Sequence, residues 1–276
     1  MPNAPVDLAR PEFPRSARYD AEFLLENQMG PCAMWLLEWL CERLSLEAGA
    51  RVLDLGCGKA MTSVFLAREY GAKVHAVDLW MDPDNSWKRL VEAGVADRVC
   101  PMRAEAHSLP FAAGYFDAIV SIDAYQYFGT DLLYLDYLAR FLRPGGQIGV
   151  VVPGLVHPVD GDVPAWLAEP QANGKVFWDP SCRSFLTAEA WRGIWRGSPA
   201  VTEVSADLQP DGWRHWAAFE RAIEAAGTGI FPSDADALET DAGRTIGFVR
   251  LLARRTGAPS ENFYDPTLGV RAGAER

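Results

Sequence analysis

Short apolar runs alternate with segments of helical periodicity along most of the chain. The run from Val52 to Leu55 is too short for a helix and is typical of a buried parallel strand. Gly56 and Gly58 interrupt it, and the apolar residues of 59–70 then recur with helical spacing. Strand, glycine turn and helix together predict the first unit of a doubly wound α/β sheet. Ligands in such sheets bind beyond the carboxyl ends of the strands.

The same alternation continues to about residue 255. Asp82 followed by Pro83 is typical of a helix start, because the carboxylate caps the helix and proline fits its first turn. The predicted strands are 52–55, 73–78, 98–102, 116–122, 147–152, 200–208 and 244–253. The predicted helices are 19–29, 32–44, 59–70, 82–93, 131–141, 187–195 and 211–225.

Three stretches depart from this pattern. Residues 1–18 contain four prolines and little periodicity, so we expect a flexible N-terminal arm. Residues 153–186 are rich in proline, and we expect an inserted cap of about 153–199 over the carboxyl edge of the sheet. Residues 256–276 form a tail that is mobile or wrapped on the surface. One domain, 19–255, is therefore predicted to carry the cap.

The residues around the glycine turn restrict the ligand that could bind there. A dinucleotide fingerprint requires glycine or alanine three residues after Gly58, where this chain has Met61. The carboxylate of Asp54 would repel a pyrophosphate and suits a ligand with cationic groups. S-adenosylmethionine (SAM) carries two such groups, an ammonium and a sulfonium. The alternative is an ordinary glycine turn in an unrelated α/β protein.

A second acid, Asp78, ends the second predicted strand, 20 residues after Gly58. A carboxylate at this position can accept hydrogen bonds from both ribose hydroxyls of a nucleoside. The alternative is a solvated acid at a strand end. In combination with the glycine turn, Asp78 favours a nucleoside ligand.

Composition and charge disfavour several classes of partner. The 276 residues are 49% hydrophobic and 23% charged, which is typical of a globular protein with a complete sheet. The net charge of −11 disfavours binding to nucleic acid or anionic lipid. We find neither an apolar run of membrane-spanning length nor the core of a signal peptide. Because the five cysteines are scattered, we expect free thiols in a reducing cytoplasm and no metal site.

The motifs in order resemble those of one enzyme family. Asp54-x-Gly56-x-Gly58, the acid Asp78, the pair Glu105-Ala106 and the turn 143–146 resemble class I SAM-dependent methyltransferases of the small-molecule type. The resemblance is to the ubiquinone-biosynthesis and cyclopropane-synthase-like branch. It implies a Rossmann-like, doubly wound sheet of seven strands, with the last strand antiparallel at the sixth position. The implied cofactor is SAM, and its product is S-adenosyl-L-homocysteine.

The resemblance also assigns residues to the cofactor, and the segments 26–31, 125–129 and 212–216 look like a bacterial subgroup of the family. It implies that the glycine turn holds the methionine end of SAM, that Asp78 binds the ribose, and that Glu105-Ala106 lies beside the adenine. The cofactor-binding residues that we expect are Tyr19, Asp54, Gly56, Cys57, Gly58, Asp78, Leu79, Glu105, Ala106 and Ser121.

The catalytic candidates follow from the chemistry of the donor. A sulfonium methyl is already activated, so a base is needed only where the acceptor is protonated. Asp123 and Tyr125, after the fourth strand, and His157, in the cap, are the candidates. Asp123 could instead bind the SAM ammonium or cap the following turn. His107 is interpreted as a loop residue.

Six of the ten tryptophans lie between residues 155 and 220. They either fix the cap to the sheet or line an aromatic pocket for a flat or cationic acceptor. We expect methyl transfer to an O, N or C atom of a small organic molecule, with no nucleic acid or membrane as partner and a homodimer left open. The alternatives are a SAM-binding regulatory protein without turnover and a nicotinamide-dependent oxidoreductase.

Overall fold

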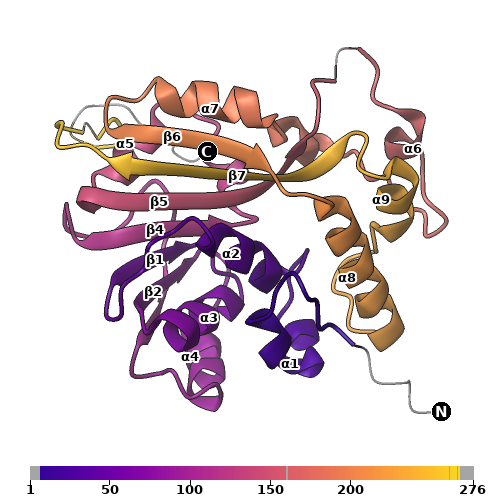
Figure 1. Ribbon diagram of the computed structural model, residues 1–276, viewed down its shortest axis with the longest axis horizontal. Helices are drawn as coiled ribbons and strands as arrows, with labels where there is room; N and C mark the ends of the chain where they lie inside the picture. The colour runs from indigo at the N-terminus through magenta and orange to yellow at the C-terminus, as the bar shows by residue number, and fades with distance from the viewer. Residues whose placement is uncertain (1–6, 160, 261, 266, 268–276) are drawn as a thin grey trace.

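The structure, a computed structural model, describes residues 7–159, 161–260, 262–265 and 267. Its centre is a seven-stranded sheet with the strand order β3-β2-β1-β4-β5-β7-β6. The strands are β1 (Arg51–Leu55), β2 (Lys73–Asp78), β3 (Val99–Arg103), β4 (Phe116–Ile122), β5 (Leu142–Leu155), β6 (Val201–Leu208) and β7 (Ile246–Arg255). Strands β1 to β5 pair in parallel, and β7 runs antiparallel to both β5 and β6. Figure 1 shows the arrow of β7 reversed at the sixth position, which confirms the predicted fold.

The two faces of the sheet are covered by different helices, because successive strand side chains point to opposite faces. Val52 belongs to the apolar cluster that includes residues of α2, α3 and α4, whereas Leu53 belongs to the cluster with α5 and α7. The helices are α1 (Ala21–Glu26), α2 (Ala33–Cys41), α3 (Met61–Tyr70), α4 (Pro83–Glu92), α5 (Tyr134–Ala139), α6 (Ala165–Ala168), α7 (Ala188–Arg196), α8 (Gly212–Ala226) and α9 (Ala235–Asp241).

Side-chain hydrogen bonds near the starts of two helices explain where those helices begin. The carboxylate of Asp82 accepts a hydrogen bond from the N–H of Asp84 at 2.8 Å and caps α4, as the Asp-Pro pair predicts. The helix expected over 131–141 is shorter, because Asp131 Oδ1 accepts from the N–H of Leu133 and holds a turn there.

A group of helices stands beyond the carboxyl ends of the parallel strands (Figure 1). It consists of α6, α8 and α9, joined in part by a hydrogen bond from Trp166 Nε1 to Asp241 Oδ1. The cap was expected over 153–199, but α7 within that range packs on β6 and β7 instead. Helices α8 and α9, which follow residue 199, cover the edge in place of α7. Buried apolar residues of both helices belong to the same cluster as Leu167 of α6.

The described parts of the predicted arm and tail pack against the rest of the chain. In the arm predicted over 1–18, Leu8 and Phe13 are each only 3% exposed, and Ser16 donates to Glu38 from both its N–H and its hydroxyl. Residues 1–6 lie outside the described residues. In the predicted tail, Tyr264 packs its ring against Tyr137 at 5.3 Å. Among the described helices, none has the length and apolar character needed to cross a lipid bilayer.

Candidate functional site

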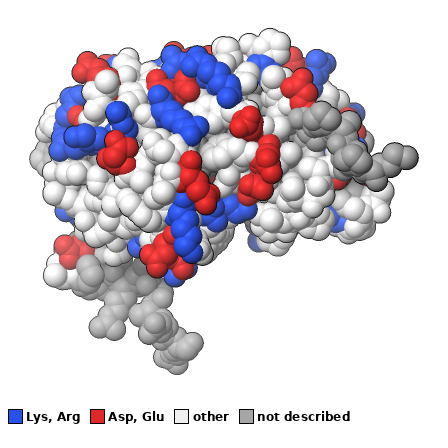
Figure 2. All heavy atoms as spheres, turned by 90° about the horizontal axis from the view of Figure 1, so that it is seen from below, with Lys and Arg blue, Asp and Glu red and all other residues white. Residues whose placement is uncertain are grey.

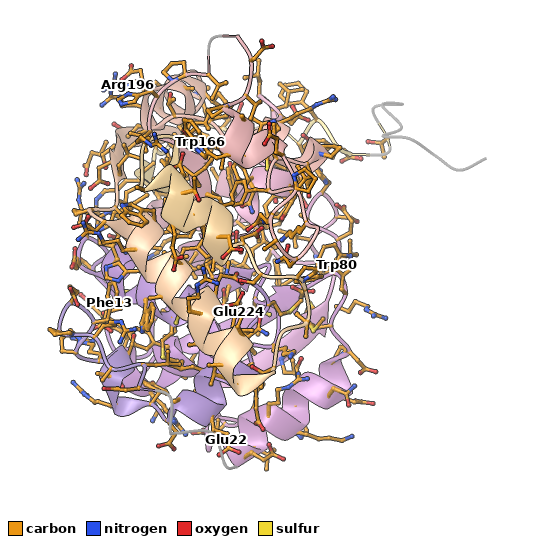
Figure 3. The ribbon with its side chains drawn as sticks, turned by 90° about the vertical axis from the view of Figure 1, so that its right-hand side faces the viewer. Phe13, Glu22, Trp80, Trp166, Arg196 and Glu224 are labelled. Atoms are coloured by element: carbon orange, nitrogen blue, oxygen red, sulfur yellow. The ribbon has the colours of Figure 1, made fainter. Side chains whose placement is uncertain are left out.

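A cavity of about 500 Å³ opens at the carboxyl edge of the sheet. Its volume falls within the ~300–1,000 Å³ that small-molecule sites usually occupy. Figure 3 looks onto this edge, with α8 and α9 toward the viewer and Trp80 projecting at one side. The lining comes from the loops after β1 to β4, from the segment before α2, and from the connection between α8 and α9. The lining residues lie within 27–33, 55–62, 77–80, 104–107 and 122–128, and also include Phe231.

The glycine turn after β1 forms one wall and tolerates no side chain. Gly56 has φ +76°, and a Cβ there would lie 2.3 Å from the Cβ of Ala124. Gly58 has φ +51°, and a Cβ there would lie 2.9 Å from Met29 Sδ. Both glycines therefore supply backbone where larger residues would displace the loop or block the cavity.

Asp78 is held rigidly beside that turn. Its Oδ2 accepts from the N–H of Gly58 at 2.9 Å, and its Oδ1 accepts from the N–H groups of Trp80 and Met81 at 2.8 and 3.1 Å. A carboxylate has about four acceptor positions, so these three bonds orient the group without exhausting it. The end of β2 thus presents a fixed acceptor to the cavity.

Asp54 was expected to contact the ligand, but it lies behind the turn and does not line the cavity. The alternation of β1 directs it toward α3, where its Oδ2 accepts from the hydroxyls of Thr62 and Ser63, each at 2.6 Å. Burial raises its pKa to about 6. In the described part of the chain, Asp54 Oδ1 has no hydrogen-bond partner. The side chain therefore anchors the start of α3 under the glycine turn.

The loop after β3 forms the next part of the wall. Glu105 Oε2 accepts from the N–H of His107 at 2.8 Å, while Glu105 Oε1 lies 2.7 Å from His107 Nδ1. The His107 ring packs against Tyr264 at 4.8 Å. These contacts fix the loop and place Ala106 in the lining.

Asp123 is the catalytic candidate that the structure brings into the cavity. It has φ +53°, an unusual backbone conformation for a residue other than glycine. Its Oδ1 accepts from Gln126 Nε2 at 3.1 Å, and its Oδ2 lies 3.0 Å from where a Cβ of Gly30 would be. Burial raises the pKa of Asp123 to about 7. The hydrogen bond from Gln126 opposes this rise, and the negative charge of Glu220 adds to it to a smaller extent.

The other two catalytic candidates lie elsewhere. Tyr125 is fully buried below the edge, with its ring 5.7 Å from Trp191 and 5.8 Å from Trp195. The short 3₁₀ helix that follows β4 turns Tyr125 back into the core and away from the cavity. His157 is exposed on the loop after β5 and is not part of the lining.

Two expected cofactor residues also lie outside the cavity. Ser121 is fully buried in β4 and donates its hydroxyl to the carbonyl of Leu55 at 2.7 Å. Tyr19 donates to Glu69 at 3.3 Å and lines a separate polar hollow. The expected residues that do line the main cavity are Gly56, Cys57, Gly58, Asp78, Leu79, Glu105, Ala106 and Asp123.

Several lining residues had no predicted role. The segment 27–31 forms part of the wall, although the sequence had marked 26–31 only as similar to a subgroup. Gln28 Nε2 in this segment donates to the carbonyl of Thr228 at 3.1 Å and ties it to the connection after α8. That connection supplies Phe231, whose exposure of 63% places it at the rim.

Three of the six tryptophans between residues 155 and 220 are buried in the core. None of the six between residues 155 and 220 is among the described residues that line the cavity. Trp191 and Trp195 fill the core under β6 and β7, and Trp216 packs its ring 5.0 Å from Phe248. Aromatic residues of the cavity come instead from Trp80, Tyr127, Phe128 and Phe231.

The stretch that contains the glycine turn is similar to known proteins. Residues 52–146 match the family model described as a methyltransferase domain. Over 128 residues the chain is 34% identical to the methyltransferase GfsG of Streptomyces halstedii, a match that covers 45% of this chain and 46% of that protein. The chain thus spans about half the length of this relative.

Two solved structures share the fold at low identity. The phosphoethanolamine N-methyltransferase 2 of Haemonchus contortus, solved with SAM, has a TM-score of 0.64 at 18% identity, covering 90% of this chain and 58% of that one. The (4+2)-cyclase SpnF has a TM-score of 0.62 at 20% identity, covering 84% and 85% of the two chains. Residues 52–146 therefore match the model of a methyltransferase-domain family, and the chain shares its fold with solved methyltransferase structures.

Proposed function

We propose that this protein transfers a methyl group from SAM to a small organic acceptor. The observation that carries the proposal is the joint position of the glycine turn and Asp78 on one wall of the cavity. The wall pairs backbone that a ligand can approach closely with an oriented carboxylate. This pairing suits a nucleoside that carries a diol.

The residues of the wall fit SAM better than a dinucleotide. Asp78 keeps acceptor capacity for a ribose hydroxyl, because backbone N–H groups occupy only three of its about four acceptor positions. The lining contains Asp78, Glu105 and Asp123 as carboxylates against the single ammonium of Lys59, among the residues that the structure describes. A lining with this excess of negative charge favours a cationic ligand and repels a pyrophosphate. Met61, where a dinucleotide site needs a small residue, adds to the case against a nicotinamide cofactor.

Each part of the wall would hold one part of the cofactor. The turn 56–58 would lie against the methionine end, Asp78 would accept from the ribose, and Leu79 with Ala106 would flank the adenine. When bound, SAM supplies a methyl group on a positively charged sulfur. Asp54 would act indirectly, by holding α3 and the turn in place.

The remaining lining residues would receive the acceptor. Tyr127, Phe128 and Phe231 supply apolar surface, and Asp123 supplies a carboxylate beside them. Fixing the acceptor in line and keeping water out can lower a barrier by ~7–11 kcal/mol. Asp123 would take the proton that an acceptor hydroxyl or ammonium must lose, which is typically worth roughly 10²–10⁴-fold in rate.

The charge pattern on one face supports a small-molecule acceptor in place of a polymer. On the face seen in Figure 2, Lys and Arg side chains are interspersed with Asp and Glu over the described surface. Such a surface lacks the concentrated positive charge that nucleic acid binding uses. The five cysteines are all free thiols, which supports a reducing cytoplasm as the location.

Calorimetry with SAM, S-adenosylhomocysteine and NAD tests the cofactor, and isotopically labelled SAM with fractionated metabolites tests the transfer. We expect binding of SAM and its product, no binding of NAD, and label in a small organic product. Binding of NAD alone would refute the proposal. Tight SAM binding with no labelled product from any fraction would instead support a regulatory SAM-binding protein.

A further inference from the structure

Two oxygens near the acceptor end of the cavity lack a hydrogen-bond donor in the part of the chain that the structure describes: one belongs to Asp123, which lines the cavity, and the other to Gln126, which lies behind the lining. Gln126 is 1% exposed, and its Nε2 donates to Asp123 Oδ1. This orientation leaves Gln126 Oε1 buried and without a partner among the described residues. The other oxygen of Asp123, Oδ2, faces the cavity next to Gly30, where no side chain covers it.

The charge around these oxygens is negative and uncompensated. Asp123 forms no ion pair with a Lys or Arg of the described chain, although Lys175 pairs with Asp234 at 2.7 Å in the cap. Glu220 of α8 is 8% exposed and adds to the negative potential at Asp123. Lys59, the cation of the lining, lies at the glycine turn and donates to the carbonyl of Glu26 at 2.8 Å.

A half-buried carboxylate without a cation opposes folding, and so does a buried amide oxygen without a partner. Retention of such a carboxylate at a cavity wall is typical of a site that a ligand completes. A neutral hydroxyl has one hydrogen to donate, whereas a primary ammonium has three and carries the charge that the site lacks. The aromatic faces of Tyr127 and Phe128 beside them also attract cations.

We infer that the acceptor half of the cavity binds an amine on an apolar body, held in its ammonium form by Asp123, which the hydrogen bond from Gln126 orients from behind the lining. This inference rests on the proposed function, because it names the acceptor class for the same transfer. The apolar body would lie on Phe231, Tyr127 and Phe128. Glu220 stabilises the bound charge from behind the wall.

The methyl transfer requires only the acceptor amine, the methyl donor and Asp123. The ammonium first loses one proton to the carboxylate of Asp123, which frees the nitrogen lone pair. A nitrogen–carbon bond then forms to the methyl group as the carbon–sulfur bond breaks, and its electron pair stays on sulfur. The products are the methylated ammonium, S-adenosylhomocysteine and a protonated Asp123.

The same oxygens could hold an ammonium from a second source, the methionine end of the cofactor. The two sources differ in what Asp123→Asn would change. If the acceptor supplies the ammonium, the variant loses amine affinity and keeps its affinity for S-adenosylhomocysteine within about threefold. If the cofactor supplies the ammonium, the variant loses affinity for S-adenosylhomocysteine and keeps its affinity for the amine, and our inference is overturned.

The test uses three probes with one apolar body: 2-phenylethylamine, 2-phenylethanol and 3-phenylpropionate. Calorimetry of the full chain with saturating S-adenosylhomocysteine should give an affinity for the amine at least about tenfold above the alcohol, with the carboxylate weakest. Asp123→Asn should reduce the amine's advantage to less than about threefold. Equal affinity for the three probes, or no measurable binding of the amine, overturns the inference.

Two further variants complete the design. Glu224→Gln on α8 removes one exposed carboxylate that pairs with Arg221, and should leave all three affinities unchanged. Gln126→Met keeps the length of the side chain without the amide, and should weaken amine binding even if Asp123→Asn fails to fold. Failure of S-adenosylhomocysteine itself to bind would refute the proposed function, whereas normal cofactor binding with no preference for the amine refutes this inference alone.

Discussion

The cofactor half and the acceptor half of the cavity are built in different ways. The cofactor half uses loops that directly follow β1, β2 and β3, so its residues have fixed places relative to the strands. The acceptor half joins the loop after β4 to 27–31 and Phe231, which are about 200 residues apart. Backbone geometry therefore defines the first half, and tertiary packing defines the second. Substitutions should reveal this difference in size and in kind.

The largest effect should come from Gly56→Ala. A methyl group there would lie 2.3 Å from the Cβ of Ala124, at φ +76°, so the loop must shift away from its present position. We expect calorimetry to detect no SAM binding. The matched control is Gly49→Ala, with φ +83° and open space around it, which should lose a little stability and keep its affinity. Normal binding by Gly56→Ala would separate the turn from the cofactor.

A smaller effect on the same half should come from Asp78→Asn. The amide accepts fewer hydrogen bonds than the carboxylate, so we expect SAM affinity to fall by at least about tenfold. Asp82→Asn is the control, since asparagine also caps helices well and Asp82 is not in the lining. If both variants bind SAM equally well, Asp78 has no role in cofactor binding.

On the acceptor half, the effect should depend on pH. The folded protein holds the proton of Asp123 up to about pH 7, while an unfolded carboxyl releases it near its ordinary value of 3.8. The contribution of Asp123 to stability is therefore present at low pH and is lost as the pH rises to about 7. Besides burial, the hydrogen bond from Gln126 lowers the pKa of Asp123 and the charge of Glu220 raises it.

Asparagine carries no proton to lose, so Asp123→Asn should gain stability relative to the wild type between pH 5 and pH 8. Thermal unfolding of both proteins at the two pH values measures the difference, expected to be a few degrees. A melting-temperature difference that does not change with pH would contradict the raised pKa. Glu224→Gln serves as the control for the removal of one negative charge.

The smallest effect should come from Tyr125→Phe. The hydroxyl of Tyr125 is buried without a partner among the described residues, so its removal should leave stability unchanged or raise it slightly. Methyl transfer should change by less than about twofold. Tyr134→Phe is the contrast, because its hydroxyl donates to the carbonyl of Ala106 at 3.1 Å, and its loss should cost about 1 kcal/mol of unfolding free energy. A large loss of transfer in Tyr125→Phe would reinstate it as a catalytic candidate.

These contrasts explain what the sequence could predict. The order of strands and helices and the positions of Gly56, Gly58 and Asp78 follow from local patterns, because each lies at a strand end whose location the apolar runs define. Tyr125 was misplaced because spacing along the chain does not tell which way a 3₁₀ turn faces. Phe231 could not be found, since a single exposed aromatic residue in a polar connection gives no local signal. The position of Asp54 could have been predicted, because strand alternation places it on the same face as Val52, under α3.

The hydrogen bond from Gln28 to the carbonyl of Thr228 has a consequence for ligand exchange. It couples the segment beside the glycine turn to the connection that carries Phe231. A movement of either segment that keeps this bond would carry the other segment with it. The release of the product cofactor and the exchange of the acceptor would then be linked through Gln28.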